Sequence, residues 1–221
     1  MTAVSLDSLL VLGFLLGLRH AVEADHLAAI STIVTERRSL LSSSLVGACW
    51  GLGHTLALLF AAVGVLLLRY QLTERMAHGL ELCVGIMLVL LGANVLRTLR
   101  RGQSPTQEHT AVAAHSHADV WLVSRPLFVG MVHGLAGSAP LLLLTLTVVS
   151  SPLAAFSYIA VFGVGSILGM TIMSVLVGAS ARLTVQFART NLAVRGLSGL
   201  LSVGLGLFIV YEHAVLNRLF A

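Results

Sequence analysis

Residues 6–30 read LDSLLVLGFLLGLRHAVEADHLAAI, and this stretch decides the fold expected for the chain. It is long and apolar enough to cross a membrane as a helix, which needs about 20 largely apolar residues. Its second half nevertheless carries a cluster of ionisable side chains: Arg19, His20, Glu23, Asp25 and His26. Each charge at membrane depth costs at least about 2.5–3.5 kcal/mol, so the cluster needs compensation, which a bound cation would supply. The stretch therefore predicts a spanning helix with a cation site inside it.

The composition of the whole chain is that of a polytopic membrane protein. Of its 221 residues, 57% are hydrophobic and 10% are charged, against roughly a quarter charged in soluble domains. Six spans are predicted, at residues 6–30, 41–68, 77–96, 126–149, 153–179 and 194–213. Ser150, Ser151 and Pro152 separate the fourth from the fifth, because proline is favoured near a helix start. The expected fold class is all-α, a membrane protein with six transmembrane helices.

The distribution of arginine predicts the orientation in the membrane. All 13 basic residues are arginines. Nine lie in or beside predicted loops one, three and five, and three lie on the other side of the membrane. Loops rich in arginine stay on the cytoplasmic side. We therefore expect a multi-pass protein of the bacterial inner (plasma) membrane, with the odd-numbered loops in the cytoplasm and both termini outside it. The basic charge then reflects orientation, and no nucleic-acid partner is expected.

Two short motifs recur at nearly the same spacing in both halves of the chain. Gly17-Leu-Arg-His20 matches Gly130-Met-Val-His133 at an offset of 113, and Gly51-Leu-Gly-His54 matches Gly163-Val-Gly-Ser166 at an offset of 112. Since each half holds three predicted helices, the second half enters the membrane from the opposite side, as in inverted-repeat transporters. The predicted division is a first half at 1–98, a cytoplasmic histidine-containing loop at 99–125 and a second half at 126–221. Chance likeness between glycine-rich apolar stretches is the alternative.

The helical period limits which clustered side chains can meet one ion. At about 100° per residue, His20, Glu23 and His26 fall within one stripe of about 120°, whereas Asp25 points about 140° away from His20. Either the helix is locally unwound here, or Asp25 orients a neighbouring histidine instead of binding the ion. An ion pair between Arg19 and Glu23 is the alternative without a metal.

Histidines elsewhere in the chain are further candidate ligands. His54 is the sole ionisable side chain between Arg38 and Arg69 and follows a glycine, so it is the natural fourth ligand. His133, the repeat mate of His20, is an additional candidate, as is Glu23. Three histidines of the predicted loop would hold metal loosely or belong to a solvated linker: His109, His115 and His117. Imidazole and carboxylate ligands suit nickel, cobalt, zinc, copper or iron.

These residues resemble those of a known family. His20-Ala-Val-Glu-Ala-Asp25-His26, an H-x4-D-H sequence inside an apolar helix, resembles the hallmark motif of the nickel/cobalt transporter (NiCoT) family. Gly51-Leu-Gly-His54-Thr resembles its second motif. Residues 130–140, GMVHGLAGSAP, are similar to a motif of the shorter six-helix branch of urease-accessory-type nickel permeases. The resemblance implies a helical-bundle fold and metal binding by His20, Asp25, His26 and His54. Full-length members have more helices than are predicted here.

The predicted function is membrane transport of Ni²⁺ or Co²⁺, in the direction of uptake, through an intramembrane site of histidine and aspartate. The ion is the transported ligand, and no prosthetic group is expected. Expected partners are the ion, the lipid bilayer and metallochaperone or metalloenzyme maturation proteins, and a homo-oligomer is left open. The chain has no lysine for a Walker A loop, so no nucleotide drives transport within it.

Three alternatives stay open: efflux through the same site, a metal-sensing or accessory subunit, and an intramembrane enzyme. A metallohydrolase could use Glu23, which lies between His20 and His26, as its general base. The spacing of these residues is not the H-E-x-x-H of known metalloproteases, however. As a serine protease it would use Ser138, for which no base with a third orienting residue is evident. We therefore predict that the chain is not an enzyme.

Overall fold

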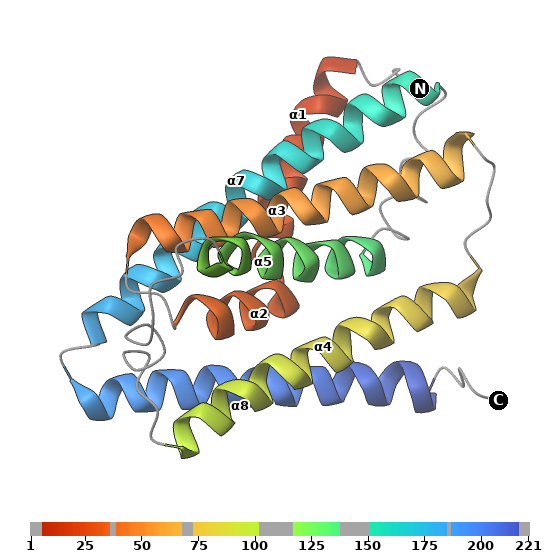
Figure 1. Cartoon of the computed structure of the whole chain (residues 1–221). Coiled ribbons are helices and arrows are strands. Elements are labelled where there is room, and N and C mark those ends of the chain that lie inside the picture. Colours follow the sequence, from red (N-terminus) through yellow and green to blue (C-terminus); the bar gives the residue numbers. More distant parts are fainter. Residues whose placement is uncertain are drawn as a thin grey trace.

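Helices make up all the regular structure in the computed structural model of this chain, which describes residues 6–35, 39–67, 73–101, 117–137, 151–184 and 187–216. The α-helices are α1 (Leu6–His20), α2 (Ala24–Val34), α3 (Leu40–Ala62), α4 (Glu74–Arg100), α5 (His117–Ala136), α7 (Pro152–Thr184) and α8 (Ala188–Tyr211). Two π-helical segments, η1 (Val63–Leu67) and η2 (Glu212–Leu216), extend α3 and α8 (Figure 1). The predicted all-α class is confirmed for these residues.

Four stretches of helix are long and apolar enough to cross a membrane: Leu40–Leu66, Glu74–Arg100, Pro152–Thr184 and Arg189–Val215. They correspond to the second, third, fifth and sixth predicted spans. Large apolar side chains on them are exposed, among them Phe60, Leu90 and Phe208. Such apolar surface suits contact with lipid. These features are typical of a helical membrane protein, and the count of six spans stays a prediction.

The first predicted span is wrong as one continuous helix. Helix α1 ends at His20, and α2 begins at Ala24. The backbone N–H of Val22 donates to the carbonyl of Arg19 at 3.0 Å, which closes a turn, and Glu23 is extended with ψ of 149°. Helical periodicity could not locate the break, because residues 21–23, which form it, are all tolerated within a helix. The helix is therefore locally unwound at the charged cluster, which is one of the two alternatives considered for it.

Several helix boundaries differ from the sequence-based limits. Helix α5 begins at His117, upstream of the predicted start at Pro126, which lies inside the helix. Arg125 and Arg195, counted with the loops, therefore lie within α5 and α8. Helix α7 begins at Pro152, one residue before the predicted start and at the predicted break, since a proline in the first turn loses no intrahelical hydrogen bond. The sequence therefore locates a helix start that is marked by proline better than a helix start inside a polar stretch.

Helix α3 runs between α7 and α5 (Figure 1). It packs against α5 and α7; α1 packs against α7, and α4 pairs with α8. The short helix α2 is enclosed by α3, α4, α7 and α8, and most of its side chains are buried. At 11 residues, with a rise of about 1.5 Å per residue, it is too short to cross a membrane. Protein surrounds most of α2, whereas residues 22–24 at the break before it are exposed.

Glycines allow the helix backbones to approach closely. A Cβ on Gly17 of α1 would collide with the carbonyl oxygen of Phe162 on α7, and one on Gly130 of α5 would collide with the carbonyl oxygen of Trp50 on α3. Small residues at such contacts are typical of helix packing in membranes. The position of α1 and α5 relative to α3 and α7 therefore depends on the absence of side chains at these glycines.

We predict that Gly17→Val lowers the thermal unfolding midpoint of the purified chain in detergent, because overpacking a close contact typically costs about 1–3 kcal/mol. Gly204→Val on α8 is the matched control, since a Cβ there meets nothing within 4 Å. Both substitutions change helix propensity equally, so the difference between the two midpoints reports the collision with α7. Equal midpoints would contradict the packing of α1 against α7.

Candidate metal centre

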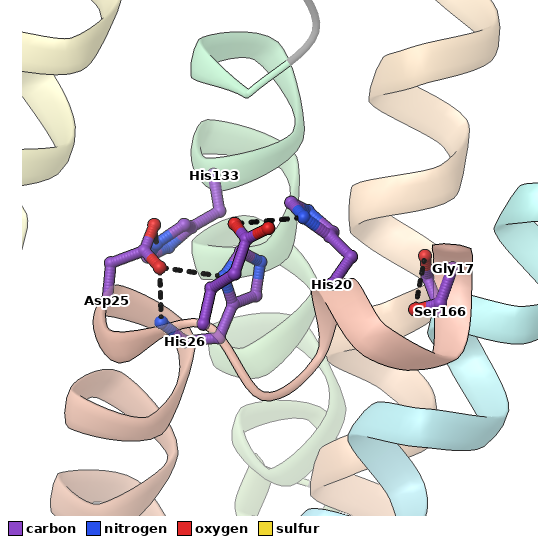
Figure 2. A network of polar contacts seen from close by, with 7 residues as sticks. Gly17, His20, Asp25, His26, His133 and Ser166 are labelled. Carbon is purple, nitrogen blue, oxygen red and sulfur yellow. Dashed lines mark hydrogen bonds and ion pairs between the residues drawn. The ribbon is translucent and has the colours of Figure 1, made fainter. Parts of the chain in front are cut away.

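The break in the first span gathers side chains from four helices. His20 ends α1, Asp25 and His26 lie in the first turn of α2, and α3 and α5 contribute His54 and His133. The His20 ring centroid lies 4.5 Å from that of His26 and 4.9 Å from that of His54. The His26 ring lies 4.6 Å from that of His133. Figure 2 shows His20, Asp25, His26 and His133 pointing toward one another. The structure thus brings the four predicted ligands and the additional candidate His133 into one cluster.

Asp25 holds two of the imidazoles. Its Oδ1 accepts from the backbone N–H of His26 at 2.9 Å and lies 3.0 Å from His26 Nδ1, while its Oδ2 lies 3.1 Å from His133 Nε2. Asp25 also occupies the first turn of α2, where a negative charge is favoured by the helix dipole. The two sequence-based alternatives thus both apply: the helix is interrupted, and the carboxylate contacts histidines.

The carboxylates determine which nitrogen of each neutral imidazole carries the lone pair. Glu23 Oε2 lies 3.0 Å from His20 Nδ1, as Asp25 Oδ1 does from His26 Nδ1. A carboxylate only accepts, so the proton sits on Nδ1 in both rings and the lone pair on Nε2. Those two Nε2 atoms and both ring nitrogens of His54 are buried and have no hydrogen-bond partner among the described residues. Four buried nitrogens thus lack the partner that such atoms normally have.

The nitrogens are close enough to share an ion. Ligand atoms from His20, His26 and His54 lie within 4.8 Å of one another, and so do ligand atoms from Asp25, His26 and His133. Three imidazoles, or two imidazoles and a carboxylate, are ligand sets for borderline divalent metals, and orientation of a ligating histidine by a carboxylate is the usual outer shell. His26 belongs to both sets, so two neighbouring positions share one ligand.

The acids lie at the accessible edge of the cluster and the imidazoles at its buried end. The Glu23 side chain is 55% exposed and that of Asp25 is 29% exposed. His54 has no exposed surface, and His26 and His133 have almost none. A cation that approaches from the exposed edge therefore meets negative charge first and imidazole nitrogens deeper in the protein.

Comparison with known proteins identifies the relatives of the chain. It is 36% identical to the urease accessory protein UreH of Bacillus sp. (strain TB-90), in an alignment that covers 100% of this chain and 98% of the relative. The chain belongs to the UreH family. No family model matches it, and no solved structure does.

Two proteins of Arabidopsis thaliana are more distant relatives. The chloroplast proteins FOR GROWTH AND FERTILITY 2 and FOR GROWTH AND FERTILITY 1 are each 28% identical to this UreH-family chain, over 91% and 90% of its length. The chain spans about half the length of these two proteins, 55% and 57%. The similarity to UreH, in contrast, extends along both chains.

Sequence reasoning missed the aromatic residues that enclose the site of this UreH-family chain. The indole of Trp50 stacks on His26 with ring centroids 5.6 Å apart and planes 11° apart, and it also lies 5.6 Å from the ring of His133. Phe162 lies 5.5 Å from His20. Trp50 precedes His54 by four residues on α3, a spacing that puts both side chains on one helix face and could have indicated the contact. These rings hold the imidazoles in place and keep water out.

The remaining predicted residues of the UreH-family chain lie at the edge of this cluster or outside the described residues. Glu23 pairs with His20 and not with Arg19, which is exposed. His109, His115 and Ser138 lie outside the described residues. The backbone of His117 begins α5, but its side chain also lies outside the described part. The loose loop site and the serine-protease alternative therefore stay predictions.

We predict that His54→Leu makes the metal-free UreH-family chain more stable while removing the part of its stabilisation by metal that comes from this cluster. The substitution deletes two buried nitrogens without a partner, each of which costs about 1–3 kcal/mol. The measurement is the thermal unfolding midpoint with and without NiCl₂. Leu56→Met, on an exposed part of the same helix, should leave both midpoints unchanged. A metal-free midpoint that falls on His54→Leu would show that the imidazole has a structural partner.

Proposed function

We propose that this chain transports a divalent transition-metal ion, nickel or cobalt, across the membrane in the direction of uptake. The observation that carries the proposal is the set of buried imidazole nitrogens of His20, His26 and His54 that lack a protein partner. They lie in a helical membrane protein at a broken helix, the kind of place where many transporters bind substrate. The name of the UreH relative, a urease accessory protein, agrees with the resemblance to urease-accessory-type nickel permeases and the wider nickel/cobalt transporter family.

The charges of the cluster suit a divalent cargo. Asp25 and Glu23 supply two negative charges, and the imidazoles bind in their neutral form. An ion of charge +2 therefore makes the loaded site neutral, which reduces the cost of holding it among apolar helices. In this proposal His20, His26 and His54 bind the ion, and Asp25 orients His26 and His133. The ion can then pass to a second position, bound by Asp25, His26 and His133. His26 belongs to both ligand sets and so stays bound to the ion during this step.

Packing between the two halves supports the inverted repeat that the proposal needs. Gly17 of α1 contacts Phe162 of α7, and Gly130 of α5 contacts Trp50 of α3. Gly17 and Gly130 are 113 residues apart, and Trp50 and Phe162 are 112 apart. These are the offsets of the repeated motifs, so one contact is the repeat mate of the other.

The last helix of each half fits the same relation. On α4 and α8, Gly85 approaches Gly206 and Gly92 approaches Gly199. Gly199 follows Gly85 by 114 residues, and Gly206 follows Gly92 by 114 residues. If each glycine is replaced by its counterpart in the other half, one contact pair becomes the other. Such a relation between six spans would allow the halves to rock about a fixed midplane site and open it alternately to each side.

Uptake leads the ion to the cytoplasm, where metallochaperone or metalloenzyme maturation proteins would receive it. The proposed setting is the bacterial inner membrane, with the odd-numbered loops in the cytoplasm and both termini outside. The arginines of those loops support this orientation. Efflux would use the same ligands in the opposite direction.

We predict that Asp25→Asn lowers radioactive nickel uptake into oriented proteoliposomes at least tenfold, because an outer-shell carboxylate is typically worth about 10–100-fold in metal affinity. Asp7→Asn is the matched control: Asp7 lies in the first turn of α1, is exposed and is remote from the cluster. Both variants should insert and elute as the parent does. Uptake by Asp25→Asn at the parental rate would refute the site. Loss of nickel from loaded vesicles of the same orientation, without uptake into empty ones, would indicate efflux.

We also predict that nickel binding weakens once the pH falls far enough to protonate the ligating imidazoles. A protonated imidazole cannot bind a metal, so each histidine that must lose a proton lowers the apparent affinity by up to about tenfold per pH unit once it titrates. The sign is therefore binding at neutral pH and release in acid. Calorimetric titration at several pH values measures it. Nickel that stays bound at every acidic pH at which the chain remains folded would mean that imidazoles are not the ligands.

A further inference from the structure

A second group of metal-ligating side chains lies away from the central cluster. His78 and Glu81 lie near the start of α4, three residues apart and so on one helix face, and His213 lies in η2 directly after α8. Helices α4 and α8 run antiparallel, since Gly85 lies against Gly206 and Gly92 against Gly199, so the start of α4 meets the end of α8 (Figure 1).

The contacts in this group form a chain. His78 Nδ1 lies 3.1 Å from His213 Nδ1, and His213 Nε2 lies 2.8 Å from Glu81 Oε2. Because the carboxylate only accepts, the His213 proton sits on Nε2, and His213 Nδ1 carries a lone pair that faces His78. One proton between the two Nδ1 atoms holds the rings together when no ion is bound.

The spacing of the two nitrogens is that of two ligands on one metal. Nitrogens at about 2.1 Å from an ion lie about 3.0 Å apart at a right-angled bite and about 3.4 Å apart at a tetrahedral one. The observed 3.1 Å falls between these values. A divalent ion can therefore replace the shared proton without movement of the helices, while Glu81 stays on the far nitrogen of His213 as a charged orienting group.

We propose that His78 and His213 form a second binding site for a divalent transition-metal ion, with Glu81 as the residue that positions His213 or completes the ligand set. Ligand atoms of the three residues lie within 4.8 Å of one another. The Glu81 side chain is 33% exposed and that of His213 is 12% exposed, so the group is reachable from outside yet partly shielded. Two imidazoles and a carboxylate favour nickel, cobalt or zinc over calcium or magnesium.

An ion bound here joins the end of α8 to the start of α4. The site shares no residue with the central cluster of His20, Asp25, His26, His54 and His133. It therefore does not depend on transport through that cluster. It adds a link across the two halves of the chain, beyond the last glycine contact between α4 and α8.

Calorimetric titration of NiCl₂ into the full chain in lipid nanodiscs tests the site. We expect two ions per parental chain and one in His213→Gln, with His78→Gln giving the same loss from the other helix. Glu81→Gln should keep the second ion with an affinity about 10–100-fold weaker. Glu212→Gln is the control, since Glu212 is the sequence neighbour of His213 but not part of the group. Unchanged unfolding midpoints without metal show that the variants fold.

The central variant His54→Leu separates this proposal from the proposed transport site. Two ions in the parent, with one lost in His54→Leu and the other in His213→Gln, support both sites. A single ion that survives His54→Leu and disappears in His213→Gln supports this site and removes the transport site. Nickel binding unchanged in both His213→Gln and His78→Gln overturns the proposal.

Discussion

The cost of burying polar groups in an apolar bundle is the constraint on which this structure depends. His54 and the Nε2 atoms of His20 and His26 are buried where no described protein atom satisfies them, at a cost that folding has to offset elsewhere. The break between α1 and α2 brings these rings together, with α2 packed among other helices. A bound cation would satisfy one nitrogen of each ring.

Backbone contacts and one carboxylate fix the positions of the histidine side chains in the cluster. Glycines let α1 and α5 lie directly against α7 and α3, so the ends of these helices are fixed to within the reach of a side chain. Asp25 then contacts His26 and His133 from two different helices. A carboxylate that contacts two imidazoles couples α2 to α5, and therefore couples the first half of the chain to the second. Such coupling is what the proposed site between two rocking halves would require.

Membership of the UreH family and the geometry of the cluster are separate observations, and both are consistent with the proposed metal site. The family follows from identity along the whole chain, whereas the cluster follows from distances between side chains. The pair His78 and His213 comes from neither the motifs nor the relatives, because its two imidazoles lie 135 residues apart in sequence. Only the antiparallel pairing of α4 with α8 brings them within hydrogen-bond distance.

The sequence by itself determined the helical class, the apolar lengths and the residues of the central cluster, because hydrophobicity and ionisable groups in an apolar run are local properties. It did not determine the break at Ala21 to Glu23 or the early start of α5, since a helical period continues through both. Tertiary structure alone decided that Asp25 contacts His133, that Trp50 stacks on His26 and that His78 meets His213. Periodicity fixes the face of a helix on which a side chain lies, whereas the side chain it meets depends on which helix packs against that face.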